Sequence, residues 1–262
     1  MGSRVRQRFL ICVMVGLLTA LGSVAASAEI RVGIATEPYP PFTVKDSTGK
    51  WVGWEIDFLD AMCREMNEKC TIVEVSWDGI IPSLNGHFID LIWASMGVNK
   101  ERLQIIDFTD AYFDSPVVFI GRRNGDTDIA PKSLAGKTIG VQAGTVHQRN
   151  VEKHYGATST IRLYQTQDEA NQDLVAGRVD YVEMDGFAAE AFLKTGVGTE
   201  CCELKSEIDY DQEFFSGGVA GGVRKDDPGL KAKLNAAIRT VIASGECQKI
   251  SRKYFTFDIC AK

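Results

Sequence analysis

The sequence predicts an α/β protein of two lobes, each built on a mainly parallel sheet flanked by helices. Strand-like and helix-like segments alternate along the chain, and the alternation starts again after Pro116, as is typical of parallel strands connected through helices. The two halves also resemble each other. Residues 87–90 (HFID) and 177–185 (GRVDYVEMD) both lead through a small turn and an aspartate into a strand. Two such lobes would bind a ligand in a crevice at the carboxyl ends of their strands.

The first half shows the periodicity of both element types. Residues 30–35 alternate and are β-branched, which indicates a strand, and the prolines of residues 36–42 favour an extended loop. Residues 55–69 have apolar side chains at helical spacing, with acidic residues early and Lys69 late, as the helix dipole favours. The other elements expected here are strands at 51–54, 71–77 and 89–98 and a short helix at 80–87.

The second half repeats the alternation and is followed by a helical C-terminal segment. Strands are expected at 117–123, within 133–145, at 161–165 and at 179–185, and helices at 146–156, 168–177 and 187–196. Residues 218–255 read as a strand, a turn and two amphipathic helices.

Residues 1–28 have the pattern of a secretory signal peptide. Three arginines precede an apolar run over 9–24, and residues 26–28 (Ala-Ser-Ala) form a small-residue cleavage site. A membrane anchor is the alternative, but the run is shorter than the roughly 20 residues that a spanning helix needs. Lipid attachment at Cys12 is disfavoured because this cysteine lies early in the run. We expect export to the periplasm of a Gram-negative cell, with Glu29 as the new N-terminus.

The exported chain is acidic. The 262 residues include 29 basic and 35 acidic ones. Because the signal peptide contains three arginines and no acidic residue, the rest of the chain has a net charge of −9. This balance disfavours nucleic acids and anionic membrane surfaces as partners, since both attract basic patches. With 45% hydrophobic residues, the chain can bury the core of one large domain or two small ones.

Six cysteines follow the leader, and export makes disulfide bonds their expected state. Cys63 and Cys70 lie so that they would connect the end of one helix to the next strand. Cys247 and Cys260 would connect the last helix to the C-terminal tail, whereas the adjacent pair 201–202 has no assignment. Zinc is the alternative, but the histidines show none of the CxxC or HExxH spacings of a zinc site. We expect no metal and no cofactor.

Two charged residues follow strand ends. Residues 89–98 pass from an apolar strand into small residues, and Arg102 comes one turn later, where its guanidinium can form paired hydrogen bonds with a carboxylate. The alternative is a solvated surface arginine. Asp185 ends an apolar strand, where a lone acid is costly unless it faces a polar partner such as an ammonium. Its alternative role is the N-cap of the following helix.

Aromatic and acidic residues complete the candidate site. Tyr39 and Trp77 follow strands and offer either aromatic faces for an aliphatic stem or core packing. Glu37 and Glu55 lie in a loop and at a helix start, where Glu55 can also simply serve the helix dipole. Together with a positive and a negative group, these residues indicate a receptor for a zwitterion, because either charge buried alone would be costly.

Several longer motifs occur in a characteristic order. They are TEPYPPF (36–42), GWEIDFLDAMCREMNEKC (53–70), WDGIIPSLNGHFIDLIWASMGVNKER (77–102), GKTIGVQAGT (136–145), AGRVDYVEMD (176–185), GGVRKDDPGLK (221–231) and KISRKYF (249–255). With them, the chain closely resembles the periplasmic solute-binding proteins of polar amino-acid ABC transporters, of the lysine/arginine/ornithine- and histidine-binding type (solute-binding protein family 3). The resemblance spans nearly all of the chain after the leader.

The resemblance implies a type II periplasmic-binding-protein fold, whose two lobes are joined by two hinge strands and close over the ligand. Lobe 1 would comprise residues 29–116 and 219–262, and lobe 2 residues 117–218 with the hinge strands. The family also contains a disulfide that corresponds to Cys63–Cys70.

Carried over residue by residue, the resemblance assigns Arg102 to the α-carboxylate of the ligand and Asp185 to its α-ammonium. It gives further roles to neighbouring residues: Ser95, the Gly97 N–H and Thr145 at the carboxylate, groups near Ala94 and Ser95 at the ammonium, Tyr39 and Trp77 around the side chain, and Glu37 or Glu55 at a distal cation.

The chain departs from the cationic subgroup at four positions. Ala94 and Gly97 stand where serines are common, and Val146 and His147 stand where Thr-Gln is common. These departures affect second-lobe and distal contacts. The resemblance therefore predicts the amino-acid headgroup of the ligand but does not determine the side chain of the ligand. His147 favours an acidic or amide group, or an opine with an additional carboxylate.

We therefore expect a monomeric periplasmic receptor and not an enzyme. Its expected ligand is a polar amino acid, with cationic amino acids among the candidates, or an opine. It would deliver this ligand to an inner-membrane ABC permease. The alternative is an exported cyclohexadienyl or arogenate dehydratase on the same fold, which eliminates water and carbon dioxide and requires a general acid over the ring. Arg102 and Asp185 together with Trp77 favour binding.

Overall fold

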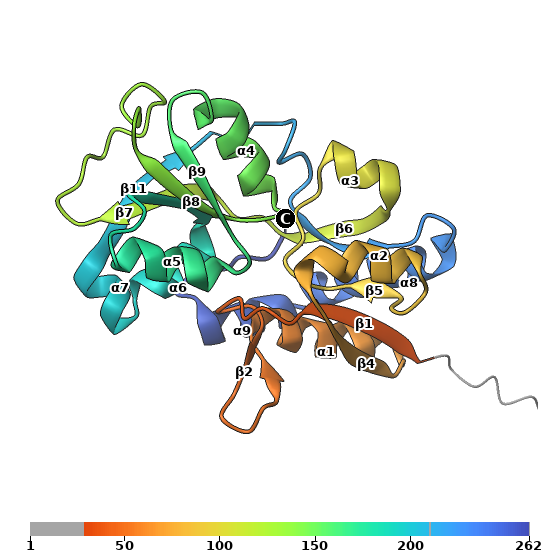
Figure 1. Ribbon diagram of the computed structural model, residues 1–262. Coiled ribbons are helices and arrows are strands. Elements are labelled where there is room, and N and C mark those ends of the chain that lie inside the picture. Colours follow the sequence, from red (N-terminus) through yellow and green to blue (C-terminus); the bar gives the residue numbers. More distant parts are fainter. Residues whose placement is uncertain (1–28, 210, 262) are drawn as a thin grey trace, which may run out of the picture.

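The computed structural model of the chain describes residues 29–209 and 211–261. The predicted signal peptide, residues 1–28, lies outside the described residues. Within them, two five-stranded sheets occupy the two halves of the molecule, as Figure 1 shows. Among these residues, no helix combines the length and the apolar character that crossing a membrane requires.

The first sheet has the strand order β4-β1-β5-β12-β6. Its strands are β1 (Ile30–Ala35), β4 (Cys70–Val75), β5 (Leu91–Ile92), β6 (Asp107–Phe113) and β12 (Val219–Val223). β1 pairs in parallel with β4 and β5, whereas β12 runs antiparallel to both of its neighbours. β12 is reversed because it returns from the second sheet, to which β6 leads.

The second sheet has the order β11-β7-β10-β8-β9. Its strands are β7 (Val117–Arg122), β8 (Thr138–Gln142), β9 (Thr160–Tyr164), β10 (Tyr181–Asp185) and β11 (Cys202–Ile208). β8 is parallel to β9 and β10, and β7 is antiparallel to β10 and β11. In each described sheet, one strand therefore runs against the other four, so the α/β prediction is confirmed and each sheet is mixed.

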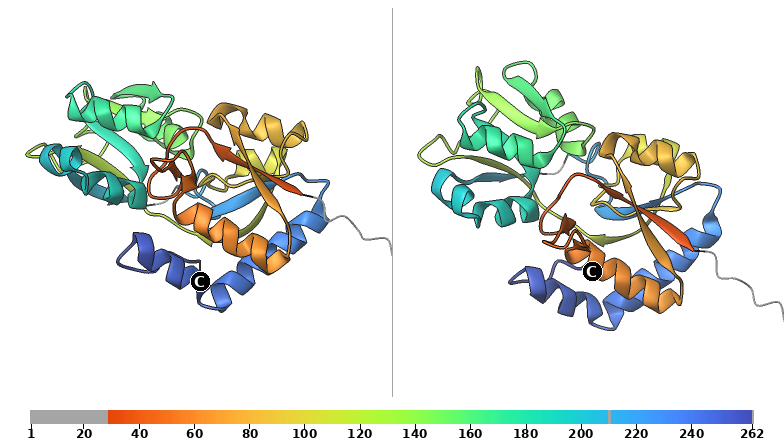
Figure 2. Two further views of the ribbon diagram at one scale, coloured as in Figure 1. Left: turned by 90° about the horizontal axis from the view of Figure 1, so that it is seen from below. Right: turned by 60° about the horizontal axis from the view of Figure 1, so that its bottom comes forward.

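Helices cover both faces of each sheet. Around the first sheet they are α1 (Trp54–Met66), η1 (Trp77–Gly79), α2 (Ile80–Asn85), α3 (Lys100–Ile105), α8 (Pro228–Ala243) and α9 (Glu246–Tyr254). α1, α8 and α9 pack side by side under one face, as both views of Figure 2 show. Around the second sheet they are α4 (Val146–Tyr155), α5 (Gln167–Val175), α6 (Gly186–Leu193) and α7 (Gly196–Cys201).

Aromatic residues dominate the core below the first sheet. Trp93 stacks on Tyr112 with ring centroids 4.0 Å apart, and both rings are fully buried. The Trp54 indole N–H donates to the Ser251 hydroxyl at 3.0 Å, so its polar atom is satisfied inside the core. This packing attaches α1 and α9 to the sheet through one shared core.

The predicted strand over 89–98 is much shorter in the structure. β5 contains only Leu91 and Ile92, and Ser95 beyond it adopts a left-handed backbone conformation with φ of 49°, so the strand does not extend to residue 98. The small hairpin β2 (Val44–Lys45) with β3 (Trp51–Val52) precedes α1. The sequence patterns assign no element to α3, β6, α7 or β11, which the structure adds.

The chain passes between the sheets twice. The first crossover, residues 114–116, joins β6 to β7, and the second lies between Ile208 and Val219. The strands of the first sheet fall within residues 30–113 and 219–223, and those of the second within 117–208.

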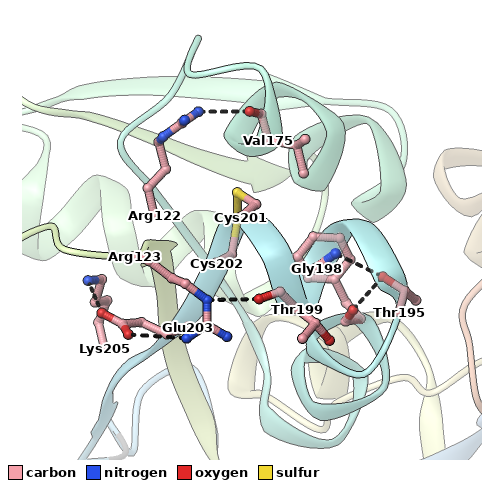
Figure 3. The surroundings of a disulfide bond; sticks show 11 residues. Arg122, Arg123, Val175, Thr195, Gly198, Thr199, Cys201, Cys202, Glu203 and Lys205 are labelled. Carbon is pink, nitrogen blue, oxygen red and sulfur yellow. Dashed lines mark hydrogen bonds and ion pairs between the residues drawn. A yellow bond between two sulfur atoms is a disulfide. The ribbon is translucent and has the colours of Figure 1, made fainter.

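The described residues contain three disulfide bonds. Cys63–Cys70 and Cys247–Cys260 are the two pairs that the sequence predicts. The third joins the adjacent Cys201 and Cys202, where α7 passes into β11 (Figure 3). This pair lies at the end of β11 remote from the second crossover, beside Arg123, whose backbone N–H donates to the Cys201 carbonyl at 2.8 Å.

We predict that the double substitution Cys247→Ser/Cys260→Ser lowers the free energy of unfolding by about 3 kcal/mol, because this cross-link restricts the unfolded chain. Urea unfolding of the oxidised proteins measures the effect. Cys201→Ser/Cys202→Ser is the matched control, and its smaller loss is expected because neighbouring residues enclose almost no chain. Equal losses for the two pairs would contradict the prediction.

Candidate functional site

A cavity of about 350 Å³ is lined by residues from both halves of the molecule. Eleven of the twelve ligand-binding residues predicted from the sequence line this cavity: Glu37, Tyr39, Trp77, Ala94, Ser95, Gly97, Arg102, Thr145, Val146, His147 and Asp185. Glu55 is outside this lining in the described structure. The cavity thus forms where the ends of β5, β8 and β10 face each other across the two crossovers.

Capping residues fix two of the lining segments. The Asn99 side chain accepts a hydrogen bond from the Arg102 backbone N–H at 2.8 Å and starts α3. Thr145 likewise accepts from the Gln148 N–H at 3.1 Å and starts α4. These caps determine where Arg102 and His147 lie on their helices.

Arg102 is a buried cation, with 7% of its surface exposed. Its Nη1 donates to the Gly97 carbonyl at 2.6 Å and its Nη2 to the Gly144 carbonyl at 3.1 Å. Its Cζ atom lies 5.3 Å from the centre of the Trp77 ring, a cation–π distance. Burial lowers the pKa of Arg102 to about 10, which keeps it charged at neutral pH. The alternative of a solvated surface arginine is therefore wrong.

Asp185 lies at the end of β10 and points into the cavity rather than capping α6. Among the described residues its side chain caps no N–H of that helix. Oδ2 accepts a hydrogen bond from the Tyr39 hydroxyl at 2.5 Å, and Oδ1 lies 3.4 Å from His147 Nε2. Because Tyr39 belongs to the first half, this hydrogen bond connects the two sides of the cavity.

His147 lies between two carboxylates. Its Nδ1 is 3.4 Å from Glu183 Oε1 and its Nε2 is 3.4 Å from Asp185 Oδ1. Burial alone would lower the pKa of His147, but the two carboxylates raise it to about 9. Glu183 is fully buried, which raises its pKa, and it accepts a hydrogen bond from Asn150 at 2.8 Å. The arrangement stabilises an imidazolium at neutral pH.

Glu55 lies beneath the cavity and is fully buried. Its Oε1 accepts from the Ser95 backbone N–H at 2.7 Å and its Oε2 from the Ser95 hydroxyl at 2.9 Å. The Tyr112 hydroxyl also donates to Oε1. Burial raises the pKa of Glu55 to about 7, although hydrogen bonds from Tyr112 and Ser95 act in the opposite direction. Glu55 thus contacts lining residues and does not itself face the cavity.

Trp77 and Glu37 form one wall of the cavity. The Trp77 backbone N–H donates to Glu37 Oε2 at 3.1 Å, which fixes the carboxylate beside the indole. A Cβ on Gly144 would lie 3.1 Å from Trp77 Nε1, and Gly144 has a φ of +70°, so only glycine allows the two halves to approach here.

Fourteen lining residues are absent from the sequence-based site, and Gln142, Gln167, Gln212 and Phe215 are among them. Gln142 ends β8 and could have been found, because the same strand-end argument identifies Arg102 and Asp185. Gln167 begins α5 and has no such signal. Gln212 and Phe215 belong to the second crossover, and the Phe215 ring centre lies 5.6 Å from that of His147. No local pattern indicates that this crossover reaches the cavity.

Several known proteins that are similar to this chain are described as solute-binding or amino-acid-binding proteins. Residues 30–257 match the family model described as bacterial extracellular solute-binding proteins, family 3. An L-arginine-binding protein of Pseudomonas aeruginosa is 37% identical over 92% of this chain and 93% of its own length. For the histidine-binding periplasmic protein of Escherichia coli K12 the identity is 37%, over 90% of each chain. The lysine/arginine/ornithine-binding periplasmic protein of the same strain is 34% identical over 95% of this chain and 96% of its own.

Solved structures are similar over nearly the same range. An ancestral arginine-binding protein bound to arginine has a TM-score of 0.78 at 31% identity, covering 87% of this chain and 98% of that one. An ancestral amino acid-binding protein described as a precursor of cyclohexadienyl dehydratase has a TM-score of 0.76 at 26% identity, covering 87% and 95%.

We predict that His147→Gln lowers the free energy of unfolding by about 3 kcal/mol near neutral pH, because buried Glu183 loses its cationic partner. The folded-state pKa of His147, about 9, lies above the usual 6.5. Its stabilising contribution is therefore complete below about pH 6.5 and is lost as the pH rises through about 9.

Urea unfolding of the wild type and His147→Gln across this pH range measures the difference. His154→Gln, on the exposed side of the same helix, is the matched control and should change stability little at any pH. A difference for His147→Gln that does not decrease at high pH would contradict the imidazolium assignment.

Proposed function

The chain belongs to family 3 of the bacterial extracellular solute-binding proteins, and we propose that it captures a polar amino acid in the periplasm and delivers it to an ABC permease. The observation that carries the proposal is a cavity of about 350 Å³ to which one half contributes buried Arg102 and the other half Asp185. Opposite charges on opposite walls match the two ends of a zwitterion.

The α-carboxylate is assigned to Arg102. Two of its N–H groups are used by the Gly97 and Gly144 carbonyls, which leaves donors of the planar fork for a ligand. Thr145 and the Gly97 backbone line the same cavity and supply further polar groups.

The α-ammonium is assigned to Asp185. The His147 imidazolium offsets the charge of one of the two carboxylates beside it. The group of His147, Asp185 and Glu183 therefore keeps a net negative charge. A ligand ammonium balances this charge, whereas a ligand without one leaves it unbalanced in a buried position.

The ligand side chain is assigned to the wall formed by Trp77, Tyr39 and Glu37. Aromatic faces suit an aliphatic or ring-shaped stem, and the Glu37 carboxylate beside Trp77 suits a distal cation. His147 already faces two carboxylates, which disfavours a further acidic group next to it. Arginine, lysine, ornithine and histidine are therefore the first ligands to test, and an opine is the second choice.

Lobe closure is assigned to bending at the two crossovers, between lobe 1 (residues 29–116 and 219–262) and lobe 2 (residues 117–218). The hydrogen bonds Tyr39–Asp185 and Arg102–Gly144 both connect the lobes. They support a receptor that acts as a monomer and encloses its ligand between two domains.

Catalysis on the same fold is the second candidate. Buried Glu55, with its pKa raised to about 7, is an observation that favours a general acid. However, its carboxylate is engaged by Ser95 and Tyr112 rather than facing the cavity. We expect no phenylpyruvate from prephenate and no phenylalanine from arogenate, as monitored by liquid chromatography. Turnover that is lost in Glu55→Gln would favour the enzyme.

We predict that one or more of these amino acids stabilises the wild type by about 2.7 kcal/mol at 100 times its dissociation constant. Arg102→Ala should remove this stabilisation and leave the fold intact, because the ligand carboxylate loses its cationic partner. Thermal unfolding of refolded, ligand-stripped protein with a panel of amino acids and opines measures both effects.

Arg239→Ala is the matched control, since Arg239 is an exposed arginine on α8 that pairs with Asp110. It should respond to ligand as the wild type does. No response of the wild type to any amino acid, or an equal response of Arg102→Ala, would refute the proposed function.

A further inference from the structure

Ser95 has no hydrogen-bond donor left for a ligand. A serine carries two donors, the backbone N–H and the hydroxyl O–H. Both are directed at Glu55, at 2.7 Å and 2.9 Å respectively. Yet Ser95 lines the cavity. Toward the cavity, the Ser95 hydroxyl oxygen can therefore only accept a hydrogen bond.

A second set of contacts holds Glu55 in place. The Tyr112 hydroxyl donates to the Glu55 carboxylate, and the Trp93 indole N–H donates to the Glu55 backbone carbonyl at 3.0 Å. Both aromatic residues are fully buried and stacked on each other. Glu55 is thus anchored from the core side, and its carboxylate cannot rotate away from Ser95 without breaking buried hydrogen bonds.

We propose that Glu55 is a positioning residue that fixes the Ser95 hydroxyl as an acceptor for the α-ammonium of the ligand. The inference rests on the proposed function and deepens it, because the ammonium is then held from both lobes, by Ser95 from one and Asp185 from the other. The family resemblance connects Ser95 with both ends of the ligand, and the proposal assigns its hydroxyl to the ammonium end alone.

The chemistry of the carboxylate makes the proposal testable. An ionised carboxylate only accepts hydrogen bonds, so the Ser95 proton must point at Glu55. A glutamine of the same shape has an NH2 group that can donate to the Ser95 oxygen. The Ser95 proton is then free to turn toward the cavity, where it repels an ammonium. Glu55→Gln therefore reverses the polarity of Ser95 with little change in volume.

A double-mutant cycle isolates this effect. The proteins are the wild type, Glu55→Gln, Ser95→Ala and the double variant, and the probes are L-arginine and L-histidine, each measured by isothermal titration calorimetry. We expect each single variant to lose about tenfold or more in affinity, the scale of a hydrogen bond to a charged group. The double variant should bind like Ser95→Ala alone, because Glu55 acts only through the Ser95 hydroxyl.

Ligands without the ammonium provide the matched comparison. 5-Guanidinopentanoate and imidazole-4-propionate differ from arginine and histidine only in lacking this group. Glu55→Gln should weaken their binding less than that of the parent amino acids. A variant that merely disturbed the fold would weaken both ligands of each pair equally, and thermal unfolding without ligand checks the fold directly.

The pH dependence gives an independent readout. The groups facing Glu55 are Tyr112 from β6, Tyr39 from the β1–β2 loop and Asp185 from β10, with His147 beside the last. The pKa values of both tyrosines are raised well above 10, and that of His147 is raised to about 9. Wild-type affinity for arginine should rise with pH through about 7 as Glu55 ionises, and Glu55→Gln should lack this rise.

The outcomes separate the inference from the proposed function. If the wild type binds no amino acid, the proposed function fails and the inference fails with it. If the wild type binds but Glu55→Gln and Ser95→Ala reduce affinity additively, or if Glu55→Gln weakens the deaminated ligands equally, only the inference is overturned.

Discussion

A charge buried away from water is stable only beside a partner, and this constraint shapes the space between the two lobes. In the described part of the chain, four of the five buried acidic or basic side chains line the cavity or contact residues that line it: Glu55, Arg102, His147 and Glu183. Each is held by protein groups. Backbone carbonyls hold Arg102, two carboxylates hold His147, and Ser95 with Tyr112 holds Glu55. The site is therefore organised before a ligand adds its own charges.

The features that sequence predicts are those encoded locally. Alternating strand and helix patterns give the α/β architecture, and charged or small residues that follow apolar strands give Arg102, Asp185 and Ser95. These residues share one physical signal, since in open α/β sheets ligands bind at the carboxyl ends of strands. Gln142 at the end of β8 carries the same signal, but the sequence-based site does not include it.

The remaining features depend on contacts between distant segments. Glu55 reads as a helix-start acid because nothing near it in sequence reveals Tyr112, which lies 57 residues away and engages its carboxylate. The end of β5 reads as a longer strand because the left-handed turn at Ser95 is held by Glu55, 40 residues away. Phe215 reaches the cavity only because the second crossover returns past α4.

Tyr39 and Arg102 both line the cavity, and each also donates a hydrogen bond to the other lobe, Tyr39 to Asp185 and Arg102 to Gly144. A substitution at either residue therefore alters two equilibria at once, the intrinsic affinity for ligand and the balance between open and closed forms of the empty protein. Selection for a new ligand through these positions would also change how often the empty receptor resembles a loaded one. Evolution of specificity is then easier at Glu37, whose hydrogen bonds with Thr36 and Trp77 stay within its own lobe.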